Sequence, residues 1–213
     1  MKMKKEVDSM DFDYFYSKQK SYFGEAPSDG LVAMLKEYDV NIGKALDIGA
    51  GEGRNSIYLA SLGFDVTSIE PTKDGANKII EKSNKLDLNI NVLNCDYLSE
   101  NLNEKYDFII AGTSLDHMEK QYLDNAVNKL KDSLNIGGLI YIVVFTESDP
   151  GYLKQFDNAS ECSGFIKHYF EENELREYFK DFDILYYNEY IKPDNTHGKP
   201  HVHGKAKLIA RKI

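Results

Sequence analysis

Apolar residues follow two patterns that alternate along this chain. Short runs of mainly apolar residues, typical of buried strands, are separated by segments with an apolar residue every three or four positions, typical of amphipathic helices. The clearest helix is Lys120–Leu134, in which Leu123, Val127 and Leu130 lie at helical spacing. The run Leu139–Thr146 is apolar almost throughout, as we expect of a strand covered on both faces of a sheet.

The alternation continues over most of the chain and predicts the fold class. Strands are predicted at Lys44–Gly49, Asp65–Glu70, Asn89–Asp96, Tyr106–Gly112, Leu139–Thr146, Phe182–Ile191 and Lys205–Ile213. Helices are predicted at Ser28–Tyr38, with Ser28 as the N-cap, and at Arg54–Gly63, Lys73–Asp87, Lys120–Leu134 and Glu171–Lys180, with Gly137-Gly138 ending the fourth. Strands that alternate with helices imply parallel crossovers, so we predict an α/β fold. It is a doubly wound, Rossmann-like sheet of seven mostly parallel strands with helices on both faces. Only the turn-rich segment Lys192–Gly204 separates the last two strands, which therefore form an antiparallel hairpin at one edge.

A glycine-rich loop follows the first predicted strand, at the strand end where α/β folds bind ligands. Its glycines, Gly49, Gly51 and Gly53, fall one residue short of the G-x-G-x-x-G spacing of dinucleotide-binding loops. Asp47 in the strand and Glu52 in the loop would repel a pyrophosphate, whereas a helix N-terminus favours an anion by only about 0.3–1 kcal/mol. The loop therefore suits a positively charged group better than a phosphate.

Two further acids follow the next strands and extend the prediction to a nucleoside. Glu70 ends the second predicted strand, where an acid can accept hydrogen bonds from both hydroxyls of a ribose. Asp96 ends the third predicted strand, where a carboxylate can accept a hydrogen bond from an adenine amino group. A ligand with a ribose, an adenine, a positive centre and no phosphate matches S-adenosylmethionine, which carries a sulfonium and an ammonium.

Several stretches of the sequence carry a family resemblance. The motifs LDIGAGEGRNS, NCDYL and YDFIIAGTSLDHM, together with Glu70, resemble those of class I S-adenosylmethionine-dependent methyltransferases. Within that class, GAGEGRNSIYLASLGFDV, SYFGEAPSDGL and FEENELREYFKDFDILYYNE resemble the tellurite-resistance methyltransferases. The chain departs from that branch at Ile191-Lys192-Pro193, where those enzymes carry a His-Arg pair, so the resemblance leaves the methyl acceptor open.

The resemblance implies which residues contact the cofactor. It implies that Asp47 binds the amino-acid end of S-adenosylmethionine and that Gly112 and Thr113 lie under the same end. It also implies that Tyr97 lies beside the adenine ring. Arg54 and Asn55 open the helix after the loop, where a capping role and a ligand contact are both open. The predicted cofactor-binding residues are Asp47, Gly49, Gly51, Gly53, Arg54, Asn55, Glu70, Pro71, Asp96, Tyr97, Gly112 and Thr113.

Histidines are the candidates for chemistry at the methyl acceptor. His117 follows the fourth strand at a position that faces the acceptor pocket in many relatives. His201 and His203 point to the same side if their segment is a strand, and we name all three histidines as candidate catalytic residues. The stretch HGKPHVH could bind a metal, but a polar turn before an edge strand explains it too, so we predict no metal. The basic run Lys205, Lys207, Arg211 and Lys212 is interpreted as a solvated strand face.

The segment before the sheet is rich in aromatic residues, from Phe12 to Phe23. In relatives such a segment forms a lid over cofactor and substrate, and a helix packed on the core is the alternative. We therefore divide the chain into a helical lid or cap segment at residues 1–43 and a methyltransferase domain at residues 44–213, within one compact domain overall.

Composition narrows the classes of partner and compartment. The net charge of −9 disfavours nucleic acids and anionic membranes as partners, and no run approaches about 18 apolar residues. Cys95 and Cys162 have no metal or redox spacing, and the start of the chain has no signal-peptide pattern, so we expect a cytoplasmic protein with free thiols. We expect a monomer or a homodimer.

The predicted function is methyl transfer from S-adenosylmethionine to a small-molecule acceptor. Because the sequence shows no obvious general base apart from the histidines, a soft nucleophile is favoured, such as a thiol or a selenium or tellurium oxyanion. One alternative is a non-catalytic protein that binds S-adenosylmethionine or S-adenosylhomocysteine. The other is an NAD(P)-dependent oxidoreductase, which the glycine spacing and Asp47 disfavour.

Overall fold

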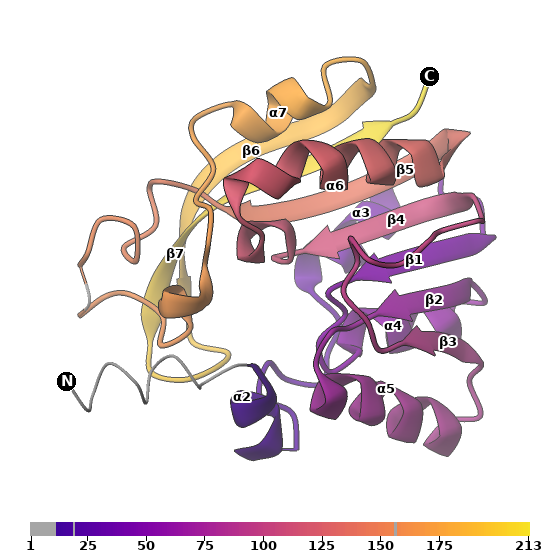
Figure 1. The fold of residues 1–213 in the computed structure, drawn as a ribbon, viewed down its shortest axis with the longest axis horizontal. Helices are drawn as coiled ribbons and strands as arrows, with labels where there is room; N and C mark the ends of the chain where they lie inside the picture. Colours follow the sequence, from indigo (N-terminus) through magenta and orange to yellow (C-terminus); the bar gives the residue numbers. More distant parts are fainter. Residues whose placement is uncertain (1–11, 19, 156) are drawn as a thin grey trace.

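The structure is a computed structural model that describes residues 12–18, 20–155 and 157–213. One sheet contains all seven strands of the described residues, in the order β3-β2-β1-β4-β5-β7-β6 (Figure 1). The strands are β1 (Lys44–Ile48), β2 (Asp65–Ile69), β3 (Ile90–Leu93), β4 (Tyr106–Gly112), β5 (Leu134–Phe145), β6 (Asp183–Asp194) and β7 (His201–Arg211). β1 to β5 pair in parallel, whereas β7 is antiparallel to both β5 and β6. The predicted doubly wound sheet with an antiparallel C-terminal edge hairpin is confirmed.

Helices cover both faces of the sheet (Figure 1). They are α2 (Phe12–Lys18), α3 (Asp29–Glu37), α4 (Arg54–Ser61), α5 (Lys73–Lys85), α6 (Lys120–Ser133) and α7 (Glu174–Tyr178), with 3-10 turns η1 (Leu115–His117) and η2 (Ser163–Phe165). Alternate residues of β4 divide between the two cores: Phe108 packs with α3 and α4, and Ile109 packs with α6 and α7. α5 lies beside β3 and α4, and α2 packs against α5.

The strand order reverses between β1 and β4, and this reversal positions the site. The chain runs outward from β1 to β3 on one side and from β4 to β5 on the other. The loops after β1 and β4 therefore diverge, and they leave a crevice at the carboxyl ends of the strands. Residues that follow these strands are brought together there, although they are far apart in the sequence.

The bounds of β5 and β3 differ from the prediction. β5 begins at Leu134, so Gly137 and Gly138 lie within it instead of separating it from α6. The extra residues are accommodated because the register with β4 shifts, and the Gly137 backbone NH donates to the Lys212 carbonyl at 2.8 Å. β3 ends at Leu93, three residues before Asp96.

The C-terminal hairpin is longer than predicted, and the preceding helix is shorter. β6 and β7 pair as far as Asp194 and His201, so only residues 195–200 form the turn, and His201 and His203 belong to β7. α7 begins at Glu174 because the carboxylate of that residue accepts a hydrogen bond from the backbone NH of Glu171, which closes a turn before the helix.

The N-terminal segment is partly described. Residues 1–11 of the predicted lid lie outside the described residues. α3 begins as predicted, with the Ser28 hydroxyl accepting from the Leu31 backbone NH, and its Leu31 and Met34 are buried in the core. Within the described ranges, no helix has both the length and the apolar character needed to cross a membrane.

Candidate functional site

A cavity of about 280 Å³ lies at the carboxyl ends of β1, β2 and β4. It is lined by the glycine loop, by Phe12, Tyr16 and Phe23 of the N-terminal segment, and by the end of the β6–β7 hairpin. Among the residues predicted from the sequence, those that line it are Asp47, Gly49, Gly51, Arg54, Asn55, Glu70, Pro71, Asp96, Tyr97, Gly112, Thr113, His117 and His203. Gly53 and His201 are the two predicted residues outside the lining.

The glycine loop takes backbone conformations that L side chains rarely adopt. Gly49 has φ +64°, and a Cβ atom there would lie 2.5 Å from the Ser114 Cβ. Gly53 has φ +81° as the N-cap of α4, and a Cβ there would lie 2.7 Å from Ile79 of α5. The third glycine therefore serves helix packing, whereas the first lets the loop pass close to the strand ends.

Asp47 is a buried carboxylate at the end of β1, only 2% exposed. The Ser56 hydroxyl of α4 donates to its Oδ2 at 2.6 Å, and the Ser68 hydroxyl of β2 donates to Ser56 at 2.8 Å. The pKa of Asp47 is raised to about 6, chiefly by burial and also by the nearby Glu70, while the Ser56 hydrogen bond opposes the shift. A cation bound in the cavity would relieve this cost of burial.

Glu70 follows β2 and ties the glycine loop to the next helix. Its Oε2 accepts from the Gly51 backbone NH at 2.7 Å, and its Oε1 accepts from the backbone NH and the hydroxyl of Thr72 at 2.9 and 2.6 Å. Burial raises the pKa of this carboxyl, and the Thr72 and Gly51 hydrogen bonds oppose the shift. Oε2 keeps a lone pair for a ligand hydroxyl, whereas Oε1 would have to exchange one of its two Thr72 hydrogen bonds for one from the ligand.

The loop after β3 differs from the prediction. Asp96 is exposed beyond the strand, and its Oδ1 accepts from the Leu98 backbone NH at 2.8 Å. Tyr97 is buried, and its hydroxyl donates to the Ala126 carbonyl of α6 at 3.2 Å. Although β3 ends earlier than predicted, Asp96 and Tyr97 both line the cavity, as the predicted contacts with an adenine require.

Arg54 and Asn55 hold the N-terminal segment over the cavity. The Arg54 guanidinium donates to the Phe23 carbonyl at 2.9 Å, and the Asn55 side-chain oxygen accepts from the Ser28 backbone NH at 3.0 Å. The sequence left a capping role and a ligand contact open for this pair. In the structure both side chains line the cavity and also fix the segment that covers it.

The buried carboxylate of Glu52 has a half-buried partner, Lys78, for which the sequence gave no signal. Its carboxylate is within 2.6 Å of the Lys78 ammonium of α5, and it also accepts from the Phe23 backbone NH at 3.2 Å. The Lys78 ammonium also donates to the Tyr16 carbonyl at 2.6 Å. This ion pair joins the glycine loop, α2 and α5, and it balances part of the negative charge that we ascribed to the loop.

Basic and polar groups gather at the opposite end of the cavity. Our interpretation of Lys205 as part of a solvated strand face is wrong, because Lys205 lines the cavity, with its ammonium 4.9 Å from the centroid of the Phe145 ring. Burial lowers the pKa of this ammonium. His117 lies at the same end, where its Nδ1 donates to the Phe165 carbonyl at 3.0 Å and its ring meets Phe12 edge-on.

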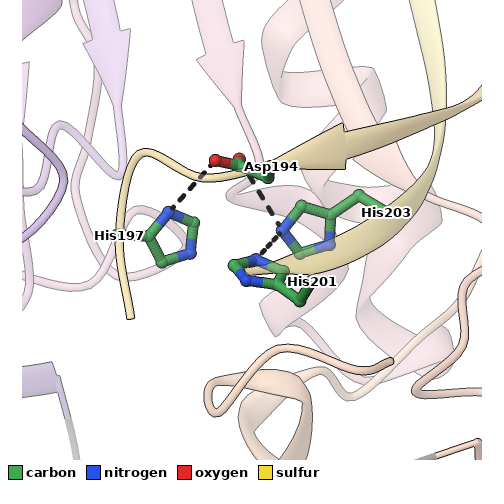
Figure 2. Close-up of side chains that lie close together, drawn as sticks. All are labelled: Asp194, His197, His201 and His203. Atoms are coloured by element: carbon green, nitrogen blue, oxygen red, sulfur yellow. Dashed lines mark hydrogen bonds and ion pairs between the residues drawn. The ribbon is translucent and has the colours of Figure 1, made fainter. Parts of the chain in front are cut away.

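Four side chains of the β6–β7 hairpin converge beside this end of the cavity (Figure 2). The Nε2 atoms of His201 and His203 lie 2.9 Å apart, which confirms that the two histidines share one face of β7. His197 in the turn approaches Asp194, with 3.8 Å between Nδ1 and Oδ1. Burial lowers the pKa of His197 to about 4. Burial opposes ionisation of Asp194, but hydrogen bonds from Thr196 outweigh it and lower the pKa of Asp194 to about 2.

Two buried polar groups near the cavity have no hydrogen-bond partner among the described residues. They are the hydroxyl of Ser114 and the carboxylate of Asp116 in η1. Burial raises the pKa of Asp116, although His117, with its Nε2 3.9 Å from the carboxylate, opposes the shift. Sequence spacing gave no signal for Asp116, since it is a single acid after β4 and the segment that packs over it, which donates to its carbonyl from the backbone NH groups of Lys167 and His168, is about 50 residues away.

The sequence of this chain matches those of TehB proteins. The family model described as tellurite resistance protein TehB matches residues 11–200. The probable S-adenosyl-L-methionine-dependent methyltransferase TehB of Haemophilus influenzae is 32% identical over 180 residues, which are 82% of this chain and 59% of that relative.

Solved structures agree with the sequence match. The crystal structure of TehB from Haemophilus influenzae aligns with a TM-score of 0.74 at 30% identity, covering 94% of this chain and 66% of that chain. A structure of an S-adenosylmethionine-dependent methyltransferase from Clostridium acetobutylicum aligns with a TM-score of 0.65 at 13% identity, over 97% of this chain and 94% of that one, which is a likeness of fold alone. This chain spans less than two thirds of the length of the TehB proteins that it matches.

Proposed function

This chain belongs to the TehB family of tellurite resistance proteins, and from this premise we propose that it is a methyltransferase that uses S-adenosylmethionine to methylate a small-molecule acceptor. The observation that carries the proposal is the pair of buried carboxylates, Asp47 and Glu70, on either side of the glycine loop. Two buried acids repel a pyrophosphate and attract a ligand with a positive centre and hydrogen-bond donors. The same pair disfavours an NAD(P)-dependent oxidoreductase.

The lining residues fit S-adenosylmethionine from end to end. Glu70 would accept from the two ribose hydroxyls, and Asp47 would face the ammonium, directly or through a water molecule. Asp96 and Tyr97 would hold the adenine, as the family resemblance implies. Gly49 and Gly51 would allow the backbone to pass close to the ligand, with Gly112 and Thr113 under its methionine end.

When bound, S-adenosylmethionine supplies a methyl group already activated for displacement by its sulfonium. The contribution of this chain is therefore to align the acceptor with that methyl and to exclude water. Phe12, Tyr16 and Phe23 would close the cavity, which supports our proposal that residues 1–43 act as a cap on the domain at residues 44–213. We propose that Lys205 attracts an anionic or soft acceptor, such as a thiolate or a selenium or tellurium oxyanion. His117 would be the base for a protonated acceptor, and His203 could serve only while its Nε2 binds nothing else.

Three further predictions from the sequence stay proposals. We propose a cytoplasmic location, consistent with the free thiols of Cys95 and Cys162. We propose that the partner is a small molecule and not a nucleic acid. We also keep the proposal that the chain acts as a monomer or a homodimer.

Calorimetry with the purified chain tests the cofactor. We expect S-adenosylmethionine to bind at micromolar concentrations, and NAD and NADP to give no heat of binding, because the acids of the cavity repel pyrophosphate. The reverse result would overturn the proposal. Product detection across thiols, selenite, tellurite, amines and phenols then identifies the acceptor, and binding without any product would favour a non-catalytic sensor.

Replacement of Glu70 by alanine tests the ribose contact. We expect S-adenosylmethionine to bind about 1–3 kcal/mol more weakly, the range for leaving buried hydrogen-bond donors unpaired. Asp65→Ala is the control, because Asp65 is an exposed acid at the other end of β2. An unchanged affinity of Glu70→Ala for S-adenosylmethionine would remove Glu70 from the site.

A further inference from the structure

We propose that His197, His201, His203 and Asp194 form a binding site for one divalent transition-metal ion, of which Zn²⁺ fits best. The four side chains come from the end of β6, the turn at residues 195–200 and the start of β7 (Figure 2). Each offers one ligand atom, and these atoms all lie within 4.8 Å of one another. From the sequence we predicted no metal at this stretch, and the proposal departs from that prediction.

The hydrogen bonds of His201 and His203 leave two lone pairs facing each other. The Nδ1 of His201 is 2.6 Å from the Lys199 carbonyl, and the Nδ1 of His203 is 3.1 Å from the Asp149 carboxylate. Both partners accept, so each Nδ1 carries the hydrogen, and each neutral ring presents its bare Nε2. The two Nε2 atoms are 2.9 Å apart, a distance at which two lone pairs repel each other unless a proton or a metal ion lies between them.

The same hydrogen bonds are those that support metal ligands in proteins. A ligating histidine almost always donates its other ring NH to a carboxylate or a backbone carbonyl, which fixes the tautomer and the ring orientation. The Asp149 carboxylate is itself held in place, because it accepts from the backbone NH groups of Gly151 and Gly204 at 2.8 and 3.0 Å. Asp149 is only 1% exposed, so its carboxylate is shielded from water and holds the His203 ring in one orientation.

The hairpin brings the ligands together through its register. Asp194 pairs with His201 across the ladder, and His203 follows on the same face of β7, with its Nε2 4.0 Å from the Asp194 Oδ2. The turn folds His197 back onto the pair, so that its ring centroid is 4.7 Å from that of His201. Three imidazoles and one carboxylate form a ligand set that zinc binds in a tetrahedral arrangement.

The distances require only small movements. Tetrahedral zinc with bonds of about 2.0–2.1 Å places its ligand atoms about 3.3–3.4 Å apart. His201 and His203 would separate slightly from 2.9 Å, and Asp194 would approach His203 from 4.0 Å. The charged groups near the cluster are Asp194 and Asp149, which attract a cation, and Lys205, which repels one.

The position of the site indicates what the ion would do. His197, His203 and Asp194 line the cavity, so an ion held by them would face its acceptor end beside Lys205. Four protein ligands close a tetrahedral site, so the ion would first of all fix the end of the hairpin beside the acceptor. To bind the thiolate or oxyanion of the acceptor directly, the ion would have to exchange the Asp194 carboxylate for it or become five-coordinate. This role rests on the proposed function, whereas the metal site itself does not.

Metal binding by the full chain is the direct test. After treatment with a chelator and dialysis, we expect one Zn²⁺ per chain at micromolar or lower concentration in competition with a colorimetric chelator. Co²⁺ in its place should give the intense visible absorption of a tetrahedral site. His201→Ala and His203→Ala should each bind at least about 100-fold more weakly, and Asp149→Asn about 10–100-fold more weakly.

His168→Ala is the matched control, because His168 is a partly buried histidine that bonds to Glu174 away from the cluster, and it should bind zinc normally. His197→Gln changes a residue of the turn and gives a second test should a strand variant fail to fold. A chain that binds no Zn²⁺ or Co²⁺ in stoichiometric amount would overturn the inference and assign the pair to a shared proton. Calorimetry with S-adenosylmethionine is scored separately, so failure of the metal site and failure of the proposed function remain distinguishable.

Discussion

Replacement of Lys78 by methionine is expected to lower the free energy of unfolding by about 3–5 kcal/mol, the range for removing one partner of a buried ion pair. The side chains of Lys78 and Glu52 are only 19% and 3% exposed. Loss of the ammonium leaves the Glu52 carboxylate buried, with the Phe23 backbone NH still donating to it at 3.2 Å. Urea unfolding followed by circular dichroism at pH 7 measures the change.

Two control variants separate the buried charge from other effects. The double variant Glu52→Gln with Lys78→Met should recover most of the lost stability, because no uncompensated charge stays buried. Lys20→Met breaks the ion pair between Lys20 and Glu25, whose side chains are 84% and 63% exposed, and should leave the stability nearly unchanged because solvent screens the pair. If Lys78→Met lowers the free energy of unfolding by less than about 1 kcal/mol, the Glu52 carboxylate must become hydrated or protonated in the variant.

The periodicity of apolar residues and the spacing of a few glycines and acids were enough to predict the sheet and the glycine-rich loop of this protein. The strand Lys44–Ile48, the glycines after it and the acid at Glu70 all follow from periodicity and spacing within about 25 residues. Because parallel strands end at the same edge of a sheet, their carboxyl ends had to meet. Side chains two positions apart point to the same face of a strand, so His201 and His203 were predicted to share one face if their segment were a strand.

Contacts between segments that are far apart in the chain could not be predicted from the sequence. Lys78 lies 26 residues after Glu52, and nothing in the spacing links the two. Lys205 has the same alternation as a solvated strand residue, but the N-terminal segment and the turn at residues 195–200 cover that end of the sheet. His197 joins the histidine pair only because β6 and β7 pair as far as Asp194, an extension that the proline at position 193 disfavoured in the sequence.

The pH dependence of S-adenosylmethionine binding is expected to report on Asp47. Burial raises the pKa of this carboxyl to about 6, with Ser56 and Arg54 opposing the shift and Glu70 adding to it. The ammonium of the ligand favours the ionised carboxylate, so binding lowers this pKa and releases a proton. Affinity should therefore be full above pH 6 and decrease as pH falls through 6, to about tenfold weaker at pH 5 than at pH 7.

Adenosine separates Asp47 from Glu70 in this measurement, because it carries the ribose and the adenine but no ammonium. The pKa of Glu70 is also raised by burial, and hydrogen bonds from the ribose favour its ionised form, so this acid weakens the binding of both ligands as pH falls. The part of the pH dependence seen with S-adenosylmethionine and not with adenosine belongs to Asp47, and it should disappear in Asp47→Asn. Calorimetry at pH 5 in buffers of different ionisation enthalpy should count close to one additional proton released with S-adenosylmethionine. Equal slopes for the two ligands would mean that the ammonium binds away from Asp47, and the amino-acid end of the cofactor would have to be assigned elsewhere in the cavity.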